Sequence, residues 1–129
     1  MGVRNLEKVT SDMCRDGALV YVAQPFGGDT NVYKVARRIM RDLIKNYPRA
    51  VFISPILQYG FMYEGVEYIE GLEICINLLR KCDGLLLLKG WQESRGCIAE
   101  WAAARALSIP IYYGDDSGNM WYEVGDANA

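Results

Sequence analysis

The stretch that most constrains this chain is LLLLKGWQESRGCIAE, residues 85–100, in which four consecutive leucines are followed by a turn and the start of a helix. Four leucines are too few to cross a membrane, and a continuous apolar run of this length is typical of a strand buried on both faces. Ser94 is a suitable N-cap for the following helix, whose free N–H groups favour an anionic ligand group. The stretch therefore predicts a buried parallel strand with a binding site at its carboxyl end.

Strand and helix patterns alternate along the rest of the chain. Strands are expected at residues 18–23, 50–55, 84–88 and 109–113, and helices at 31–47, 66–81 and 94–107. This alternation favours an α/β fold, a three-layer flavodoxin/Rossmann-like parallel sheet of about four strands in the order 2-1-3-4 with helices on both faces. In such a sheet, ligands bind where the direction of winding reverses, outside the carboxyl ends of the first and third strands.

Length and composition narrow the class of protein. The 129 residues fit one domain, residues 1–129, with residues 1–16 as a lead-in and 114–129 as a tail. A net charge of −2 gives no general attraction to nucleic-acid polymers or acidic membranes, and no apolar stretch is long enough to span a bilayer. We therefore expect a cytoplasmic protein that acts on a small molecule. Met120, Trp121 and Tyr122 have no obvious place in the expected core, which favours a homo-oligomer.

Histidine is absent, and the four cysteines have neither CxxC nor zinc-ligand spacing. A histidine-based triad and a histidine-bound metal are excluded, and we expect no metal and no cofactor. Carboxylates, tyrosines and thiols remain as candidate catalytic groups.

Glu100 is the first catalytic candidate. It follows Cys97 by three residues and precedes Ala104 by four, so it lies along the core-facing stripe of its helix. A buried carboxylate needs a hydrogen-bond donor, and Tyr21 on the first strand can supply one.

The two loops at the expected switch point contain the candidate binding residues. Gly27, Gly28 and Asp29 follow the first strand, and the two glycines allow a phosphate or sugar to approach the backbone, although a plain turn would have the same residues. Ser94 and Gly96 can bind a phosphate or form an ordinary helix cap. Trp91 can stack on a base or pack in the core.

The motifs YVAQPFGG, SP after the second strand, KCD and GWQESRGCIAEWAAA resemble the nucleoside 2-deoxyribosyltransferase-like superfamily over residues 18–113. That group includes deoxyribosyltransferases, 2′-deoxynucleoside 5′-phosphate N-hydrolases and uncharacterised phage and bacterial members. The resemblance implies a glutamate nucleophile, matched by Glu100, which attacks the anomeric carbon, and a strand tyrosine, matched by Tyr21, which holds it.

The same resemblance implies the ligand contacts. Ser94 and Gly96 match the 5′-phosphate cradle of the hydrolases, and Gly27 and Gly28 match the loop over the sugar. In the transferases an asparagine near the C-terminus of a neighbouring subunit enters the site, and Asn119 is a loose candidate for it.

One position departs from the family pattern. The aspartate that usually protonates the leaving base is replaced by Cys75, and Glu70 and Glu73 do not share its helix face.

Two functions follow as alternatives. The first is an N-glycosidase or deoxyribosyltransferase that acts on a nucleoside 5′-monophosphate, and the second is a non-catalytic module that binds or sequesters nucleotides. An interaction protein that uses the fold only as a scaffold is a third.

Overall fold

The leucine run forms β4 (Gly84–Leu87), a strand inside the sheet whose residues are all buried. In the computed structural model, which describes residues 5–26, 31–60 and 65–124, its side chains alternate between two clusters. Leu86 and Leu88 pack with Ile39 and Leu43 of α1 (Asn31–Asn46). Leu85 and Leu87 pack on the other face. Burial on both faces explains why the run is continuous rather than alternating.

The sheet has six strands in the order β1-β6-β5-β4-β2-β3. Strand β2 (Leu19–Ala23) pairs in parallel with β3 (Val51–Ile53) and with β4, and β4 pairs in parallel with β5 (Ile111–Gly114). The expectation of about four parallel strands in the order 2-1-3-4 is therefore corrected to a six-stranded mixed sheet. Winding does reverse at β2, because the chain adds β3 on one side of that strand and β4 on the other.

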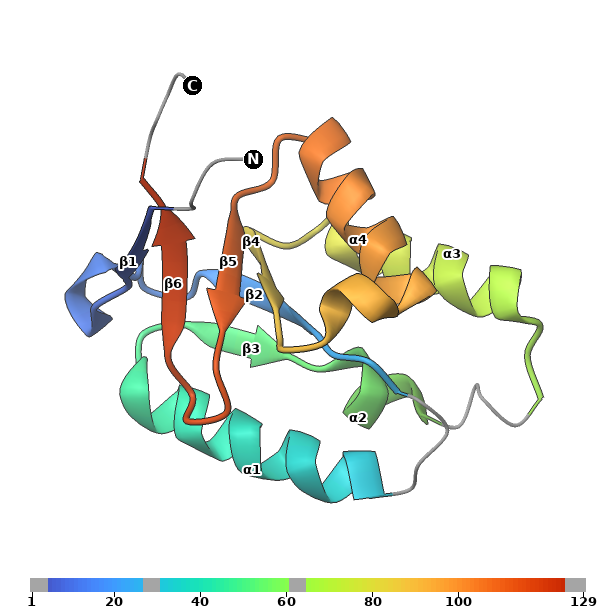
Figure 1. Cartoon of the computed structure of the whole chain (residues 1–129), viewed down its shortest axis with the longest axis horizontal. Helices are drawn as coiled ribbons and strands as arrows, with labels where there is room; N and C mark the ends of the chain where they lie inside the picture. The colour runs from blue at the N-terminus through green and yellow to red at the C-terminus, as the bar shows by residue number, and fades with distance from the viewer. Residues whose placement is uncertain (1–4, 27–30, 61–64, 125–129) are drawn as a thin grey trace.

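The two additional strands come from the lead-in and the tail. Strand β1 (Leu6–Lys8) pairs antiparallel with β6 (Met120–Glu123), and β6 pairs antiparallel with β5 (Figure 1). A 3₁₀ turn, η1 (Ser11–Met13), connects β1 to β2. Met120 is only 1% exposed and belongs to the core cluster of α1. The argument that the tail has no place in the core was therefore wrong, and it no longer supports a homo-oligomer.

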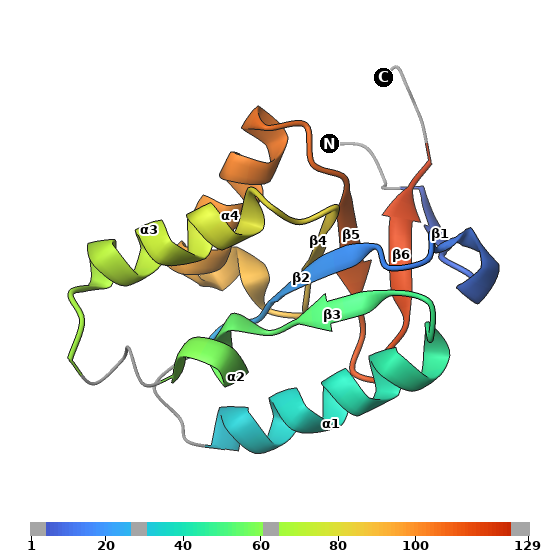
Figure 2. The same ribbon diagram turned by 180° about the vertical axis from the view of Figure 1, so that it is seen from behind.

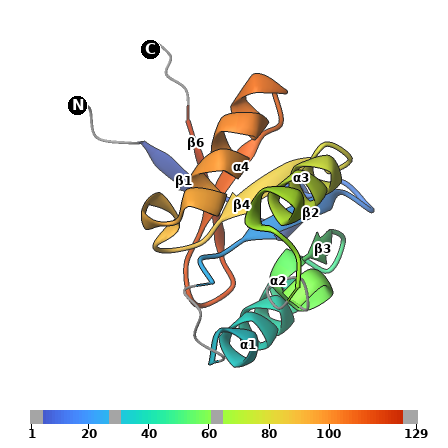
Figure 3. The same ribbon diagram turned by 90° about the vertical axis from the view of Figure 1, so that its right-hand side faces the viewer.

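Helices cover both faces of the sheet (Figures 2 and 3). Helix α1 and the short α2 (Pro55–Tyr59) lie on one face, and α3 (Tyr68–Leu79) and α4 (Arg95–Ala106) lie on the other. The sequence did not predict α2. Its start is fixed by Ser54, whose hydroxyl accepts a hydrogen bond from the Leu57 N–H, and by Pro55 in the first turn. No helix in the described ranges combines the length and the apolar character needed to cross a bilayer.

Candidate functional site

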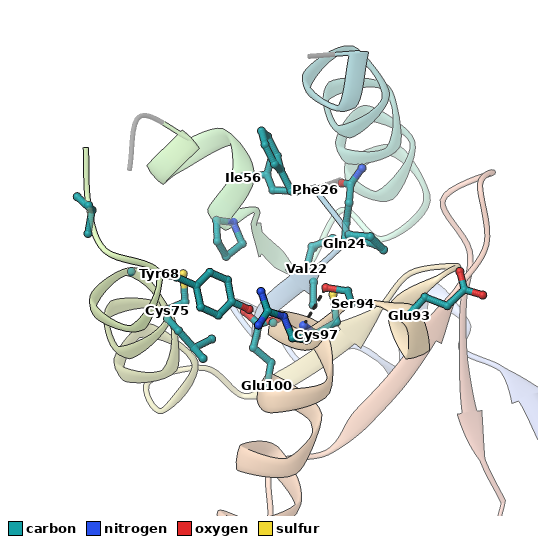
Figure 4. A pocket seen from close by; sticks show the side chains of 18 of the residues that line it. Val22, Gln24, Phe26, Ile56, Tyr68, Cys75, Glu93, Ser94, Cys97 and Glu100 are labelled. Carbon is teal, nitrogen blue, oxygen red and sulfur yellow. Dashed lines mark hydrogen bonds between the residues drawn. The ribbon is translucent and has the colours of Figure 1, made fainter. Parts of the chain in front are cut away.

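A cavity of about 570 Å³ opens where β2 and β4 end, at the point of winding reversal. Its walls come from the segment after β2, the start of α2, one side of α3 and the first turns of α4 (Figure 4). Small-molecule pockets commonly have volumes of roughly 300–1,000 Å³, so this cavity has the size of a small-molecule site.

Glu100 and Tyr21 meet at the base of this cavity. The Tyr21 hydroxyl donates a hydrogen bond to Glu100 Oε2, and Glu100, which lines the cavity, is only 8% exposed. The core-facing stripe of α4 consists of Cys97, Glu100 and Ala104, so Glu100 has the position on the helix that its spacing predicted. The strand and the helix together hold one carboxylate at the cavity wall.

Burial raises the pKa of both Glu100 and Tyr21. Desolvation raises the pKa of Glu100 to about 7, and the hydrogen bond from Tyr21 opposes this rise by favouring the carboxylate. Burial, followed by the negative charge of Glu100, raises the pKa of Tyr21 far above its usual range. Tyr21 therefore stays a neutral donor, and near neutral pH Glu100 is present both as the carboxylate and as the acid.

The first turn of α4 forms a polar edge of the cavity. Ser94 caps the helix, because its hydroxyl accepts a hydrogen bond from the Cys97 N–H at 3.2 Å. A Cβ placed on Gly96 would lie 3.3 Å from the hydroxyl oxygen of Tyr68, which leans across from α3. The absent side chain at Gly96 leaves room for Tyr68 at this edge.

Arg95 and Tyr68 are cavity residues that the sequence reasoning did not identify. The Arg95 guanidinium lies over the Tyr68 ring, 5.0 Å from its centroid. Arg95 is the one cation among the described residues that line the cavity. Arg95 could have been identified from its position directly after the Ser94 cap, because a cation there would help to bind an anionic ligand.

Cys75 of α3 also lines the cavity, beside the Tyr21–Glu100 pair. Burial raises the pKa of the Cys75 thiol, while a hydrogen bond with Tyr21 acts in the opposite direction. Burial likewise raises the pKa of Cys97 to about 12. Both groups are therefore neutral thiols at neutral pH rather than thiolate nucleophiles.

Two predicted binding residues, Trp91 and Asn119, do not line this cavity. Trp91, in the 3₁₀ turn η3 (Trp91–Glu93), packs against Trp101 and Tyr113 with ring centroids 5.9 and 6.2 Å apart, so it belongs to the core and not to the cavity wall. Asn119 donates a hydrogen bond to Asp115 in the β5–β6 turn and does not line the cavity of its own chain. Gly27, Gly28 and Asp29 lie outside the described residues.

No cluster of three or more candidate metal ligands occurs within residues 5–26, 31–60 and 65–124. The polar side chains of the described residues around the cavity are carboxylates, hydroxyls, thiols, the Gln24 carboxamide and one guanidinium. These groups are suited to acid–base and nucleophilic chemistry and to the binding of an anionic group.

Comparison with known proteins identifies the family of this chain. No curated protein matches the chain. Residues 18–113 match the family described as a domain of unknown function (DUF4406), and this range contains β2 to β5 and every residue around the cavity. The match extends over well more than half of the sequence, so the chain belongs to the DUF4406 family.

Proposed function

We propose that this protein is an N-glycosidase or deoxyribosyltransferase-like enzyme that acts on the base–sugar bond of a nucleoside 5′-monophosphate, with Glu100 as the nucleophile. The observation that carries the proposal is the pairing of a buried, cavity-facing Glu100 with the Tyr21 hydroxyl, about one and two-thirds helical turns after the Ser94 cap. The resemblance to nucleoside 2-deoxyribosyltransferase-like proteins supports the same reaction.

In the proposed reaction the Glu100 carboxylate attacks C1′ of the sugar and the bond from C1′ to the base nitrogen breaks. Water or a second base then resolves the glycosyl ester. Tyr21 orients the carboxylate and stabilises its charged form through the hydrogen bond that it donates. The 5′-phosphate binds at the start of α4, where free N–H groups, Ser94 and Arg95 supply donors and positive charge.

The test is to incubate the protein with 2′-deoxy- and ribonucleoside 5′-monophosphates and the corresponding nucleosides, and to measure released base by chromatography. Glu100→Gln should abolish release. Glu93→Gln is the matched control, because Glu93 also lines the cavity but its side chain is directed away from Glu100 (Figure 4). Release that survives in Glu100→Gln would overturn the proposed role of this carboxylate.

Cys75 favours a second candidate function. A neutral thiol stands beside Glu100 and Tyr21, where the resembling enzymes have an aspartate acid, so the cavity is also suited to a protein that binds nucleotides without cleaving them. Calorimetry that detects nucleotide binding while chromatography detects no released base would favour this binding module. Absence of binding would exclude both functions.

A further inference from the structure

Among the described residues, the cavity has no second carboxylic acid beside the carboxylate that would attack the sugar. Apart from Glu100, its lining carboxyl groups are Glu67 and Glu93. The Glu93 side chain is directed away from Glu100 (Figure 4). Glu67 precedes Cys75 by eight residues, which corresponds to roughly 12 Å along α3 at 1.5 Å per residue. The position next to Glu100 and Tyr21 is instead occupied by the Cys75 thiol.

The absence of a carboxylic acid beside Glu100 among the described residues limits which bases can leave. A neutral purine or pyrimidine departs as an anion unless an acid protonates it, and general acid catalysis contributes about 10²–10⁴-fold to such steps. A base that carries a positive charge at the bonded nitrogen or elsewhere on the ring departs as a neutral molecule and needs no proton.

The charges around the cavity agree with a cationic ring. Three glutamates and one arginine line it, and the arginine lies at the edge formed by the first turn of α4. A ring bonded to the carbon that Glu100 attacks would lie near this carboxylate, while a 5′-phosphate would lie near Arg95. A cation close to Glu100 would also favour the carboxylate form that the nucleophile requires.

The wall across the cavity from Cys75 is apolar and aromatic. It contains Phe26 and Ile56, which the close-up view places on the far side from Tyr68 and Cys75 (Figure 4). The Phe26 ring packs edge-on against Tyr33, with centroids 5.7 Å apart. Aromatic surface of this kind attracts cations as well as flat rings.

We propose that the substrate is a nucleoside 5′-monophosphate with a cationic base, such as a pyridinium or a 7-alkylated purine, an inference that rests on the proposed glycosidase function. Glu100 attacks C1′, the bond from C1′ to the ring nitrogen breaks, and its electron pair cancels the positive charge of the ring. Water then attacks C1′ and releases Glu100 together with one proton. The products are a neutral base, the sugar phosphate and that proton.

The experiment compares GMP and dGMP with their 7-methylated forms, and includes nicotinamide mononucleotide as the pyridinium probe. Each value of kcat/KM is divided by the rate of uncatalysed hydrolysis of the same compound, because cationic nucleotides are intrinsically more labile. The ratio should be at least about tenfold higher for each methylated nucleotide than for its parent, since the neutral base lacks its acid.

Cys75→Asp is the second measurement, because it places a carboxyl group at the thiol position. It should raise the rate on GMP or dGMP by about tenfold or more and reduce the preference for the methylated nucleotides. If this variant does not fold, the wild-type comparison decides alone.

The outcomes separate this inference from the function on which it rests. Equal normalised rates on neutral and methylated nucleotides, abolished by Glu100→Gln, would overturn the inference and leave the glycosidase intact. Release from none of the compounds in the wild-type protein and in folded Cys75→Asp would overturn both.

Discussion

The Tyr21 hydroxyl and the Glu100 carboxylate form a buried hydrogen bond between residues that are 79 positions apart in the chain. The bond joins a strand inside the sheet to the helix that follows the neighbouring strand. It exists only in the folded protein, and it gives the proposed nucleophile its orientation.

Tyr21→Phe should lower kcat about tenfold or more, because a donor to the reacting carboxylate is lost. The hydrogen bond holds the pKa of Glu100 below the value that burial alone would give, so the acidic limb of the pH–rate profile should shift to higher pH. Tyr113→Phe is the control, because Tyr113 donates a similar bond to the exposed Glu123. Identical pH profiles for the two variants would contradict the prediction.

Glu100→Gln should make the protein more stable at alkaline pH. The pKa of Glu100 is raised in the folded state to about 7, so the unfolded chain binds fewer protons between about pH 4.5 and 7 and the wild-type protein loses stability over that range. At about 1.4 kcal/mol per pKa unit, the variant should gain on the order of 3 kcal/mol relative to wild type between pH 4 and pH 8. Urea unfolding at both pH values measures this, and a constant difference would argue against the raised pKa.

Two serines that cap helices offer a matched pair of variants. Ser94 caps α4 at the cavity, and Ser54 caps α2. Each change to alanine should reduce the free energy of unfolding by about 1 kcal/mol, since each removes one bond to a backbone N–H. Titration calorimetry should show weaker nucleotide binding for Ser94→Ala only. Equal losses of affinity would mean that Ser94 acts as a cap and does not contact the ligand.

Gly96→Ala should weaken nucleotide binding, because the new methyl group would lie 3.3 Å from the Tyr68 hydroxyl oxygen and crowd the edge of the cavity. Gly71→Ala is the control, since Gly71 also lines the cavity but a Cβ there meets nothing within 4 Å. That control should instead stabilise α3 by about 0.5–1 kcal/mol. Unchanged affinity in Gly96→Ala would show that Tyr68 moves aside freely.

The prediction of a homo-oligomer now rests on exposed apolar side chains and on the charges of α3. Its Ile69 and Ile74 are 63% and 42% exposed, and its charges run from Glu70 near the start to Arg80 at the end, so two antiparallel copies would pair opposite charges. Light scattering should show an oligomer that Ile69→Glu dissociates. A wild-type protein that is monomeric at working concentration would refute this prediction.

The sequence predicted the parts of the fold whose periodicity reflects burial. The leucine run, the amphipathic α1 and the core-facing stripe of α4 are all recognisable from residue spacing alone. The short β1 and β6 were missed, because each residue of Leu6–Lys8 is exposed and β6 has only four residues, too few for a clear alternation. Strands β1 and β6 are far apart in the sequence, so no local sequence pattern predicts that they pair.

Only the part of the candidate site that depends on local features could be predicted from the sequence. Glu100 and Ser94 follow from helix spacing and capping, which are local properties. Trp91 was assigned to ligand stacking, but its environment depends on Trp101 and Tyr113, which reach it only through tertiary packing. Tyr68 was missed for the same reason, since it reaches the cavity from another helix, whereas Arg95 directly follows the Ser94 cap and could have been identified from the sequence.

The antiparallel edge of the sheet has a consequence for synthesis on the ribosome. Within residues 5–26, 31–60 and 65–124, β1 has β6 as its one sheet partner, and the Val124 N–H donates to the Asn5 carbonyl at 2.8 Å. Strand β1 therefore cannot pair until β6 has emerged, while β2, β3 and β4 can assemble earlier. Closure of this edge would therefore follow assembly of the parallel strands, and β1 would remain unpaired until β6 is available.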